Sequence, residues 1–291
     1  MILCPTCQAT YEIIAESCPQ CGFAPEVLEG FLCWAPEVAY CNDGFDPEAF
    51  AGLAKNEEGH FWFEARNRLI VWALQTYFPR MSSYLEGGCG TGFVLRGVTE
   101  AFPEVDLHGS EIFVDGLKFA KERHPSGHLM QIDACRMPFH EQFDVIGAFD
   151  VLEHIEADDE ALRGICAATK PGGGVILTVP QHDWLWSGVD EFACHKRRYS
   201  REGLHKLLEG AGLRVLRSTS FVSLLLPAML ASRLLGGQQL KGDADGSSEF
   251  NLSPLLNSLF SRVLDFEGRL IRAGLNFPLG GSRLVVAVKG R

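Results

Sequence analysis

The sequence has few positive charges for its length and no long apolar run. Lys and Arg number 26 against 37 Asp and Glu, so the formal net charge is -11 over 291 residues. A nucleic-acid partner needs a basic surface, and this balance argues against one. No stretch reaches the roughly 18 apolar residues of a spanning helix, and the first residues lack the basic and apolar regions of a secretory signal. We therefore expect a soluble protein of the cytoplasm.

The composition allows a large core, and the chain divides into three parts. Apolar residues make up 46% of the sequence, which suits one main domain with additions. Residues 1–25 are predicted to be a zinc-binding module, and residues 60–291 the main domain, with a helical insertion at about 220–280. Residues 26–59 form an acidic connector in which Lys55 is the one basic residue. Pro and Gly interrupt this connector, so we expect little regular structure in it.

Four of the ten cysteines fall in one short block. Cys4-Pro5-Thr6-Cys7 and Cys18-Pro19-Gln20-Cys21 are two C-x-x-C pairs. Each pair places two thiolates on one tight turn, and two such pairs complete a tetrahedral zinc site without an open position. The sequence therefore predicts a structural zinc ion, with a redox pair or free thiols as the alternatives. The predicted metal ligands are Cys4, Cys7, Cys18 and Cys21.

Strand and helix patterns alternate through the main domain. The predicted strands are 81–85, 106–110, 129–132, 143–149, 174–179, 213–219 and 283–289. The helices predicted between them are 93–102, 114–123, 158–169 and 200–211. Strands that alternate with helices at this spacing form right-handed crossovers and a parallel sheet covered on both faces. The expected fold is α/β: a Rossmann-like, doubly wound, mostly parallel sheet with an antiparallel last strand and a helical insertion before it.

A glycine-rich run stands between the first predicted strand and the first predicted helix. It reads Glu86-Gly87-Gly88-Cys89-Gly90-Thr91-Gly92. Glycine at such a turn permits positive φ and lets a ligand approach the backbone, so the run predicts a nucleotide-type cofactor loop. A dinucleotide loop has the spacing G-x-G-x-x-G, but the position of its last glycine is Phe93 here. The spacing therefore argues against a dinucleotide.

Together with four segments that follow it, this loop resembles the class I S-adenosylmethionine-dependent methyltransferases. The segments are Gly109-Ser110-Glu111, Gln131-Ile132-Asp133-Ala134, Phe143-Asp144-Val145-Ile146 and Asp150-Val151-Leu152-Glu153-His154-Ile155. They occur with the order and spacing of the family, and the resemblance covers about 60–219 and the final strand. It implies S-adenosylmethionine as the cofactor and methyl transfer as the reaction.

The resemblance also implies a role for each part of the cofactor site. The loop glycines would pack against the methionine moiety, and Glu86 would lie near its ammonium end. Glu111 would accept the ribose hydroxyls, and Asp133 would recognise the adenine edge, with capping of the following turn as the alternative for Asp133. Phe149 would lie beneath the sulfonium. The predicted cofactor-binding residues are Glu86, Gly88, Cys89, Gly90, Gly92, Glu111, Ile112, Asp133, Ala134 and Phe149.

Methyl transfer also requires a base. It is an in-line displacement, so the acceptor must be aligned and, if it is a hydroxyl or a protonated amine, deprotonated. Loops after the fourth and fifth strands should supply the base, and the candidates are His195 and His154. The alternative role of His154 is an oriented turn under the cofactor.

The run His195-Lys196-Arg197-Arg198-Tyr199 concentrates positive charge in an otherwise acidic chain. Arg197, Arg198 and Tyr199 are predicted to bind an anionic group of the acceptor. The alternative is that the two arginines pair with nearby carboxylates such as Asp190 and order a lid.

The insertion holds two apolar segments, 221–235 and 253–274. They are predicted to form an apolar lid over the site, or to contact a membrane surface peripherally through about 220–275. Ordinary packing within the domain is the alternative.

The sequence thus favours a methyltransferase for a small or lipid-linked, anionic acceptor, with O-methylation preferred. A rival is an rRNA or tRNA methyltransferase whose zinc module grips RNA, against which the acidic region before His60 argues. A third hypothesis is a noncatalytic interaction scaffold, against which the intact cofactor motifs argue. Neither the identity of the acceptor nor the oligomeric state follows from the sequence.

Overall fold

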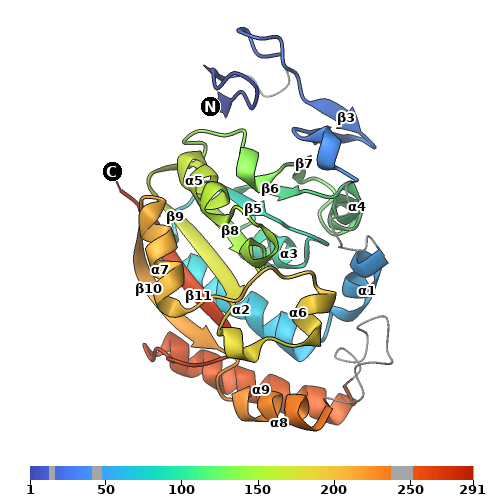
Figure 1. The fold of residues 1–291 in the computed structure, drawn as a ribbon, viewed down its shortest axis with the longest axis vertical. Coiled ribbons are helices and arrows are strands. Elements are labelled where there is room, and N and C mark those ends of the chain that lie inside the picture. Colours follow the sequence, from blue (N-terminus) through green and yellow to red (C-terminus); the bar gives the residue numbers. More distant parts are fainter. Residues whose placement is uncertain (13–16, 41–47, 237–251, 291) are drawn as a thin grey trace.

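The computed structural model describes residues 1–12, 17–40, 48–236 and 252–290. At its centre is a nine-stranded sheet with the order β10-β11-β9-β8-β5-β6-β7-β4-β3 (Figure 1). Its strands are β3 (Glu26–Leu28), β4 (Phe31–Cys33), β5 (Ser83–Gly87), β6 (Asp106–Glu111), β7 (His128–Gln131), β8 (Phe143–Phe149), β9 (Thr169–Pro180), β10 (Leu213–Phe221) and β11 (Ser282–Lys289). A second small sheet pairs β1 (Ile2–Leu3) with β2 (Thr10–Tyr11).

Nine α-helices and four short 3-10 helices lie within the described residues. The α-helices are α1 (Glu48–Asn56), α2 (Phe61–Tyr77), α3 (Phe93–Ala101), α4 (Val114–Arg123), α5 (Asp158–Ala168), α6 (Gly188–Phe192), α7 (Arg201–Gly210), α8 (Leu226–Gly236) and α9 (Pro254–Arg272). The 3-10 helices are η1 (Pro36–Val38), η2 (Ala134–Arg136), η3 (Leu152–His154) and η4 (Asp183–Leu185).

The direction of the strands confirms the predicted fold class. Each neighbouring pair from β4 to β9 in the sheet order is parallel. The last strand, β11, is antiparallel to both of its neighbours, β9 and β10. The helices α8 and α9 precede it, as the predicted insertion requires. The fold is therefore a mostly parallel α/β sheet with an antiparallel last strand.

Side chains of the central strands alternate between two apolar layers. In β11, Leu284 and Val286 belong to one layer, whereas Val285 and Ala287 belong to the other, and all four are buried. Helices α2, α3 and α4 cover the first layer, and α5 and α7 cover the second. A strand alternates its side chains with a period of two. Burial on both faces explains why these strands are continuous apolar runs in the sequence.

The acidic connector is more regular than its composition predicts. It contains β3, β4, η1 and α1, and β4 pairs in parallel with β7, so that the main sheet is extended by two strands. The backbone groups on the free side of β7 offer hydrogen bonds that a short strand can take up, and composition does not record such a partner. The N-terminal residues also dock on the main domain, because Ile2 is buried and the Leu3 amide donates to the Pro138 carbonyl at 2.9 Å. The division of the chain at residues 25 and 59 stays a prediction.

The second helix of the insertion begins where the sequence predicts it. The Ser253 hydroxyl caps α9 by accepting a hydrogen bond from the Leu256 amide. α9 packs on α2, where the rings of Phe61 and Phe260 lie 5.3 Å apart. Its exposed large apolar side chains are Leu255, Leu256, Leu259 and Phe266. Among the described residues, none of the helices combines the length and the apolar character needed to cross a membrane.

Candidate active site

A cavity of about 1150 Å³ opens at the carboxyl ends of the parallel strands. Glu86, Glu111 and Phe149 lie at or next to the ends of β5, β6 and β8 and line this cavity. In open α/β sheets, ligands bind at this edge. All of the predicted cofactor residues except Gly92 line the cavity. The structure therefore brings together residues that are far apart in the sequence.

The three loop glycines have positive φ, and the surroundings of Gly90 and Gly92 differ. The φ angles of Gly88, Gly90 and Gly92 are 67°, 51° and 76°. A Cβ on Gly90 would meet nothing closer than Phe50 at 3.9 Å, so this part of the backbone is open to a ligand. A Cβ on Gly92 would lie 2.9 Å from the Cα of Ala120, because the loop packs against α4 there. Gly92 caps α3 outside the cavity lining, so helix packing requires this glycine.

Glu111 is anchored by backbone amides at the end of β6. Its carboxylate accepts hydrogen bonds from the amides of Gly90 at 3.0 Å, Ile112 at 2.9 Å and Phe113 at 3.3 Å. Burial raises the pKa of Glu111, and these three amides oppose the increase. An ionised carboxylate has about four lone-pair sites, so capacity remains for a ligand hydroxyl. Glu111 thus joins the glycine loop to the second strand and faces the cavity.

Glu86 is buried beside the loop. Burial raises the pKa of Glu86 to about 8, although the positive charge of Arg66 opposes the increase. Within the described part of the chain, the Oε2 atom of Glu86 has no hydrogen-bond partner. A buried polar atom without a partner indicates a missing ligand or water, and a carboxylate attracts a cation. This atom therefore fits the positively charged end of a cofactor.

Asp133 caps η2, which is the alternative role predicted for it. Its side chain accepts from the Cys135 amide at 2.9 Å and pairs with Arg136 at 2.9 Å. Asp133 and Ala134 both line the cavity beyond β7. The recognition of adenine by these residues stays a prediction.

An ion pair on the cavity wall joins α2 to the end of β8. Arg66 pairs with Asp150, and the Thr178 hydroxyl donates to the same carboxylate at 3.1 Å. The Arg66 guanidinium also lies 4.4 Å from the centre of the Trp62 ring. Asp150 has no predicted role, although its place after a buried strand is a usable signal. The pair places the positive charge of Arg66 near Glu86, where it lowers the pKa of the Glu86 carboxyl.

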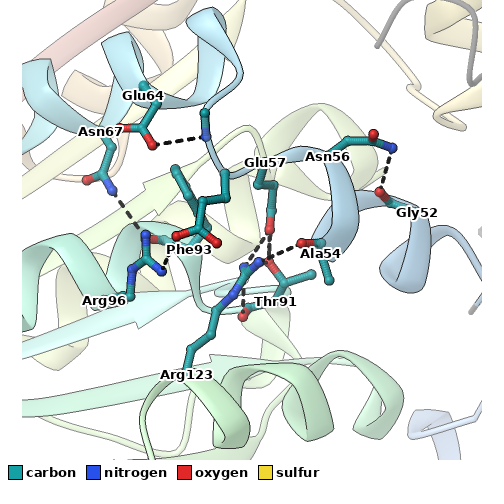
Figure 2. Close-up of polar contacts among 12 residues, drawn as sticks. Gly52, Ala54, Asn56, Glu57, Glu64, Asn67, Thr91, Phe93, Arg96 and Arg123 are labelled. Carbon is teal, nitrogen blue, oxygen red and sulfur yellow. Dashed lines mark hydrogen bonds and ion pairs between the residues drawn. The ribbon is translucent and has the colours of Figure 1, made fainter. Parts of the chain in front are cut away.

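A second buried ion pair ties the connector to the glycine loop (Figure 2). Glu57, just beyond α1, pairs with Arg123 of α4, and the Thr91 hydroxyl lies 2.8 and 2.7 Å from the two carboxylate oxygens. Arg123 also donates to the carbonyl oxygens of Thr91 and Ala54 at 3.2 and 3.0 Å. Thr91 is the residue between two loop glycines, so this network holds the loop in place.

Replacing Glu57 with Ala is expected to destabilise the protein by about 3–5 kcal/mol, because it leaves the Arg123 guanidinium unpaired. The two side chains are only 7% and 15% exposed, so solvent screens the pair weakly. The matched control is Glu58→Ala, since Glu58 is 73% exposed and its pair with Arg96 is worth about 0–1 kcal/mol. Urea unfolding of both variants measures the difference, and equal losses would contradict a structural role for Glu57.

Asp190 holds two residues of the cavity lining in place, His195 and Arg198. It is fully buried and lies 2.9 Å from the Nδ1 atom of His195, while Arg198 donates to its two oxygens at 2.7 and 3.0 Å. Burial raises the pKa of Asp190, but the hydrogen bonds from His195 and Arg198 hold it below the usual range. Because Nδ1 of His195 is held by this carboxylate, its Nε2 atom faces Glu153, at 4.0 Å from Oε1. His195 and His154 both line the cavity, and their rings lie 4.8 Å apart.

The three residues predicted to bind the acceptor have other partners. Arg197 pairs with Asp158 at 3.1 Å, and the Tyr199 hydroxyl donates to the same carboxylate at 2.8 Å. Neither residue is among those that line the cavity, whereas Arg198 lines it but is bound to Asp190. This is the alternative of pairing with local carboxylates, and the role of the three residues in acceptor binding stays a prediction.

Lys196 is the cation that the sequence analysis left unassigned. It lines the cavity, and over the described ranges of the chain its ammonium group forms no ion pair. Because its ammonium group is not held in an ion pair among the described residues, Lys196 can attract an anion in the cavity more readily than a paired arginine can. Its only sequence signal was its place in the basic run.

The fold and the cavity define a class I methyltransferase architecture, and comparison with known proteins gives the family. A methyltransferase domain model matches residues 55–218, more than half of the chain, and the chain belongs to that family. The ubiquinone biosynthesis O-methyltransferase of a Bradyrhizobium strain is 30% identical over 105 residues, which are 34% of this chain and 40% of that protein. The malonyl-[acyl-carrier protein] O-methyltransferase of Halalkalibacterium halodurans is 25% identical over 115 residues, 37% of this chain and 42% of that protein. The chain thus spans less than half the length of these curated relatives.

A solved structure agrees with this assignment. A Bacillus halodurans protein assigned as a methyltransferase matches with a TM-score of 0.51 at 18% identity, over 76% of this chain and 98% of its own. Likeness at this identity concerns the fold. The family match shows that the chain carries a methyltransferase domain, for which the sequence motifs imply S-adenosylmethionine as the cofactor. The buried Glu86 carboxylate and the open Gly90 backbone fit a cationic cofactor of this kind.

Proposed function

We propose that this methyltransferase methylates an oxygen atom of a small or lipid-linked acceptor that carries a negative charge. The observation that carries the proposal is the composition of the cavity lining. There, His195 and Lys196 lie on one wall, and apolar side chains line the same cavity. The apolar side chains include Leu225, Met229, Leu256 and Phe260. Two relatives, named above, are O-methyltransferases by name.

S-adenosylmethionine supplies an electrophilic methyl group on a sulfonium. On the protein side, Gly88 and Gly90 would admit the methionine moiety, Glu86 its ammonium group, and Glu111 the ribose hydroxyls. His195 would remove the acceptor proton at Nε2, because Asp190 holds Nδ1 and stabilises the protonated ring. Lys196 would attract the anionic group of the acceptor.

Replacing Glu111 with Ala is expected to weaken cofactor binding about 10- to 150-fold, because hydrogen bonds to a charged group are worth about 1.5–3 kcal/mol. Calorimetry with S-adenosylmethionine measures the affinity. The control is Glu100→Ala, a surface carboxylate that is 72% exposed and belongs to α3. Unchanged affinity in the Glu111 variant, or no binding by the wild type, would overturn the cofactor site.

Cofactor affinity is also expected to rise with pH up to about 8. Burial raises the pKa of Glu86 to about 8, so the carboxyl is mostly protonated at neutral pH and gains charge as the pH approaches that value. Each pH unit below this pKa should lower the affinity up to about tenfold. The variant Glu86→Gln should lose this dependence and keep only the titration of the cofactor amino group. Identical profiles for the two proteins would show that Glu86 does not bind the cofactor.

We also propose a structural zinc ion in the N-terminal module. The Sγ atoms of Cys4 and Cys21 are 3.5 Å apart, those of Cys7 and Cys18 are 3.6 Å apart, and all four lie within 4.8 Å of one another. Tetrahedral zinc with Zn–S distances of about 2.3 Å requires sulfurs about 3.8 Å apart. The four thiols thus fit the ion, and its predicted role is to hold the module against the sheet.

Peripheral membrane contact through 220–275 stays a prediction, for which the exposed leucines of α9 are the candidate contacts.

A further inference from the structure

Three side chains of the types that ligate metal ions lie close together in the cavity lining. Glu153, His154 and His195 each offer one ligand atom, and these atoms all lie within 4.8 Å of one another. Glu153 and His154 belong to η3 after β8, whereas His195 follows α6. The Lys196 amide donates to the Glu153 carbonyl at 2.7 Å and fixes the two segments side by side. All three residues are among those that line the cavity.

The Glu153 carboxylate is buried without a partner. Its exposed fraction is 0%, and in the part of the chain that the structure describes neither Oε1 nor Oε2 has a hydrogen-bond partner. The Nε2 atom of His195 lies 4.0 Å from Oε1, too far for a hydrogen bond. Buried polar groups are normally paired, and a buried carboxylate is stabilised by a cation or a metal. The Glu153 carboxylate therefore lacks, in the described part of the chain, the cation or metal ion that would stabilise it.

Both imidazoles are oriented as they are in metal sites. The Nδ1 atom of His195 is held by the buried carboxylate of Asp190 at 2.9 Å, and the ring of His154 is hydrogen-bonded to the backbone of Ala193. A metal-bound histidine almost always donates its other ring N–H to a carboxylate or to a backbone carbonyl. A hydrogen bond thus holds one nitrogen of each ring, and this fixes the direction in which the other nitrogen points.

From this arrangement, we propose that Glu153, His154 and His195 bind a divalent transition-metal ion, with zinc as the ion of highest expected affinity among those commonly available. Two imidazoles and one carboxylate are a ligand set of catalytic zinc sites, which keep a position for water or substrate. Imidazole ligands select such ions over Mg²⁺ and Ca²⁺. Ligand atoms about 2.0–2.1 Å from a tetrahedral ion are about 3.4 Å apart. The 4.0 Å separation between His195 Nε2 and Glu153 Oε1, and any wider separation up to the 4.8 Å limit, must therefore contract when the ion binds.

The consequence for the reaction rests on the proposed function. The open position of the ion faces the cavity that would hold the acceptor, so the site favours acceptors with an oxygen ligand, such as a phenol, another hydroxyl or a carboxylate. With the ion bound, the Nε2 atom of His195 is a metal ligand and no longer the base. The proposal therefore narrows the acceptor class and changes the role of His195.

The test is a titration of the full chain with Co²⁺ and Zn²⁺, with metal content measured per chain. Cobalt in the four-cysteine site gives intense sulfur-to-metal charge-transfer absorption, whereas cobalt bound by Glu153 and the two histidines gives only weak d–d bands. We expect a second ion in the wild type, and its affinity should fall at least about 100-fold in Glu153→Gln and His195→Asn. Asp190→Asn should lower that affinity about 10- to 100-fold, because the Asp190 carboxylate orients the His195 ring. The control Glu156→Gln should keep the second ion, since Glu156 lines the same cavity but is 83% exposed.

The proposal is wrong if the wild type binds only the ion of the cysteine site, or if the second ion persists in both Glu153→Gln and His195→Asn. If a variant does not fold, the imidazole resonances of His154 and His195 in the wild type decide, because zinc must shift both. Calorimetry with S-adenosylmethionine on the same samples separates the two proposals. A second ion without cofactor binding contradicts the function and leaves the metal site, whereas cofactor binding without a second ion contradicts the metal site alone.

Discussion

Replacing Cys18 with Ser is expected to abolish stoichiometric zinc and to release the N-terminal module from the main sheet. A four-thiolate site has no spare ligand, and the free energy of zinc binding in such modules is also folding free energy. The Cys18 amide donates to the Phe23 carbonyl at 2.6 Å, and the Phe23 ring stacks on Trp34 with 6.2 Å between ring centres. Trp34 directly follows β4, so the module reaches the edge of the sheet through a short path.

Loss of the module should also weaken cofactor binding. The buried side chain of Gln131 is hydrogen-bonded to both backbone groups of Ala35, at 3.0 and 2.9 Å, and donates to the Ile112 carbonyl at 3.0 Å. Ile112 lines the cavity next to Glu111. If β4 leaves β7, Gln131 loses two of these three hydrogen bonds, and the segment at Ile112 that should hold the adenine is no longer fixed.

The measurements are zinc content, hydrogen exchange of residues 1–40 and cofactor calorimetry on the Cys18→Ser variant. The control is Cys166→Ser, a buried thiol in α5 outside the cysteine block. It should keep its zinc and its cofactor affinity. One zinc ion per chain that persists in Cys18→Ser would refute the four-cysteine site. Lost zinc with unchanged cofactor affinity would refute the coupling through Gln131.

The sequence predicts the main sheet well because its strands carry their own signal. The apolar run of β11 and the glycine turns between helices and strands do not depend on distant partners. The connector is different, since β4 forms only because β7 leaves one edge free to pair with Leu32 and Cys33. An acidic segment with Pro and Gly gives no local sign of that edge. The start of β9 was also missed, because Thr169 pairs with Phe143 before the glycine turn.

The same distinction applies to the cavity. Glu111 was found because its position at a strand end and its spacing from the glycine loop are local properties. Asp150 and Glu153 carry no comparable local signal, because the partner of each comes from a distant element. Arg66 of α2 reaches Asp150, and His195 reaches Glu153 only after the chain has crossed β9 and α6. Composition and spacing do not record such encounters.

Replacing His195 with Ala is expected to lower turnover roughly 10²- to 10⁴-fold, which is the range of general base catalysis. Cofactor affinity should change little, because the side-chain contacts of His195 are with Asp190, Glu153 and His154, none of which is a predicted cofactor-binding residue. The acceptor is first identified by labelling a fractionated extract with labelled cofactor, and steady-state rates then compare the variant with the wild type. The control is His182→Ala, whose ring stacks on Trp184 at 5.1 Å outside the cavity lining.

A chelator then distinguishes the two roles of the His195 Nε2 atom, at a concentration at which metal analysis shows that the second ion is lost and the zinc of the four-cysteine site is kept. If this atom accepts the proton directly, wild-type activity survives removal of the second metal ion. If it binds the ion, activity disappears with the ion and returns when zinc is added back, whereas His195→Ala is not rescued at the same zinc concentration. Unchanged turnover in His195→Ala would exclude both roles and leave His154 or water as the proton acceptor. The buried carboxylate of Glu153 favours the second result, because a direct base at His195 would leave that carboxylate without any partner among the described residues.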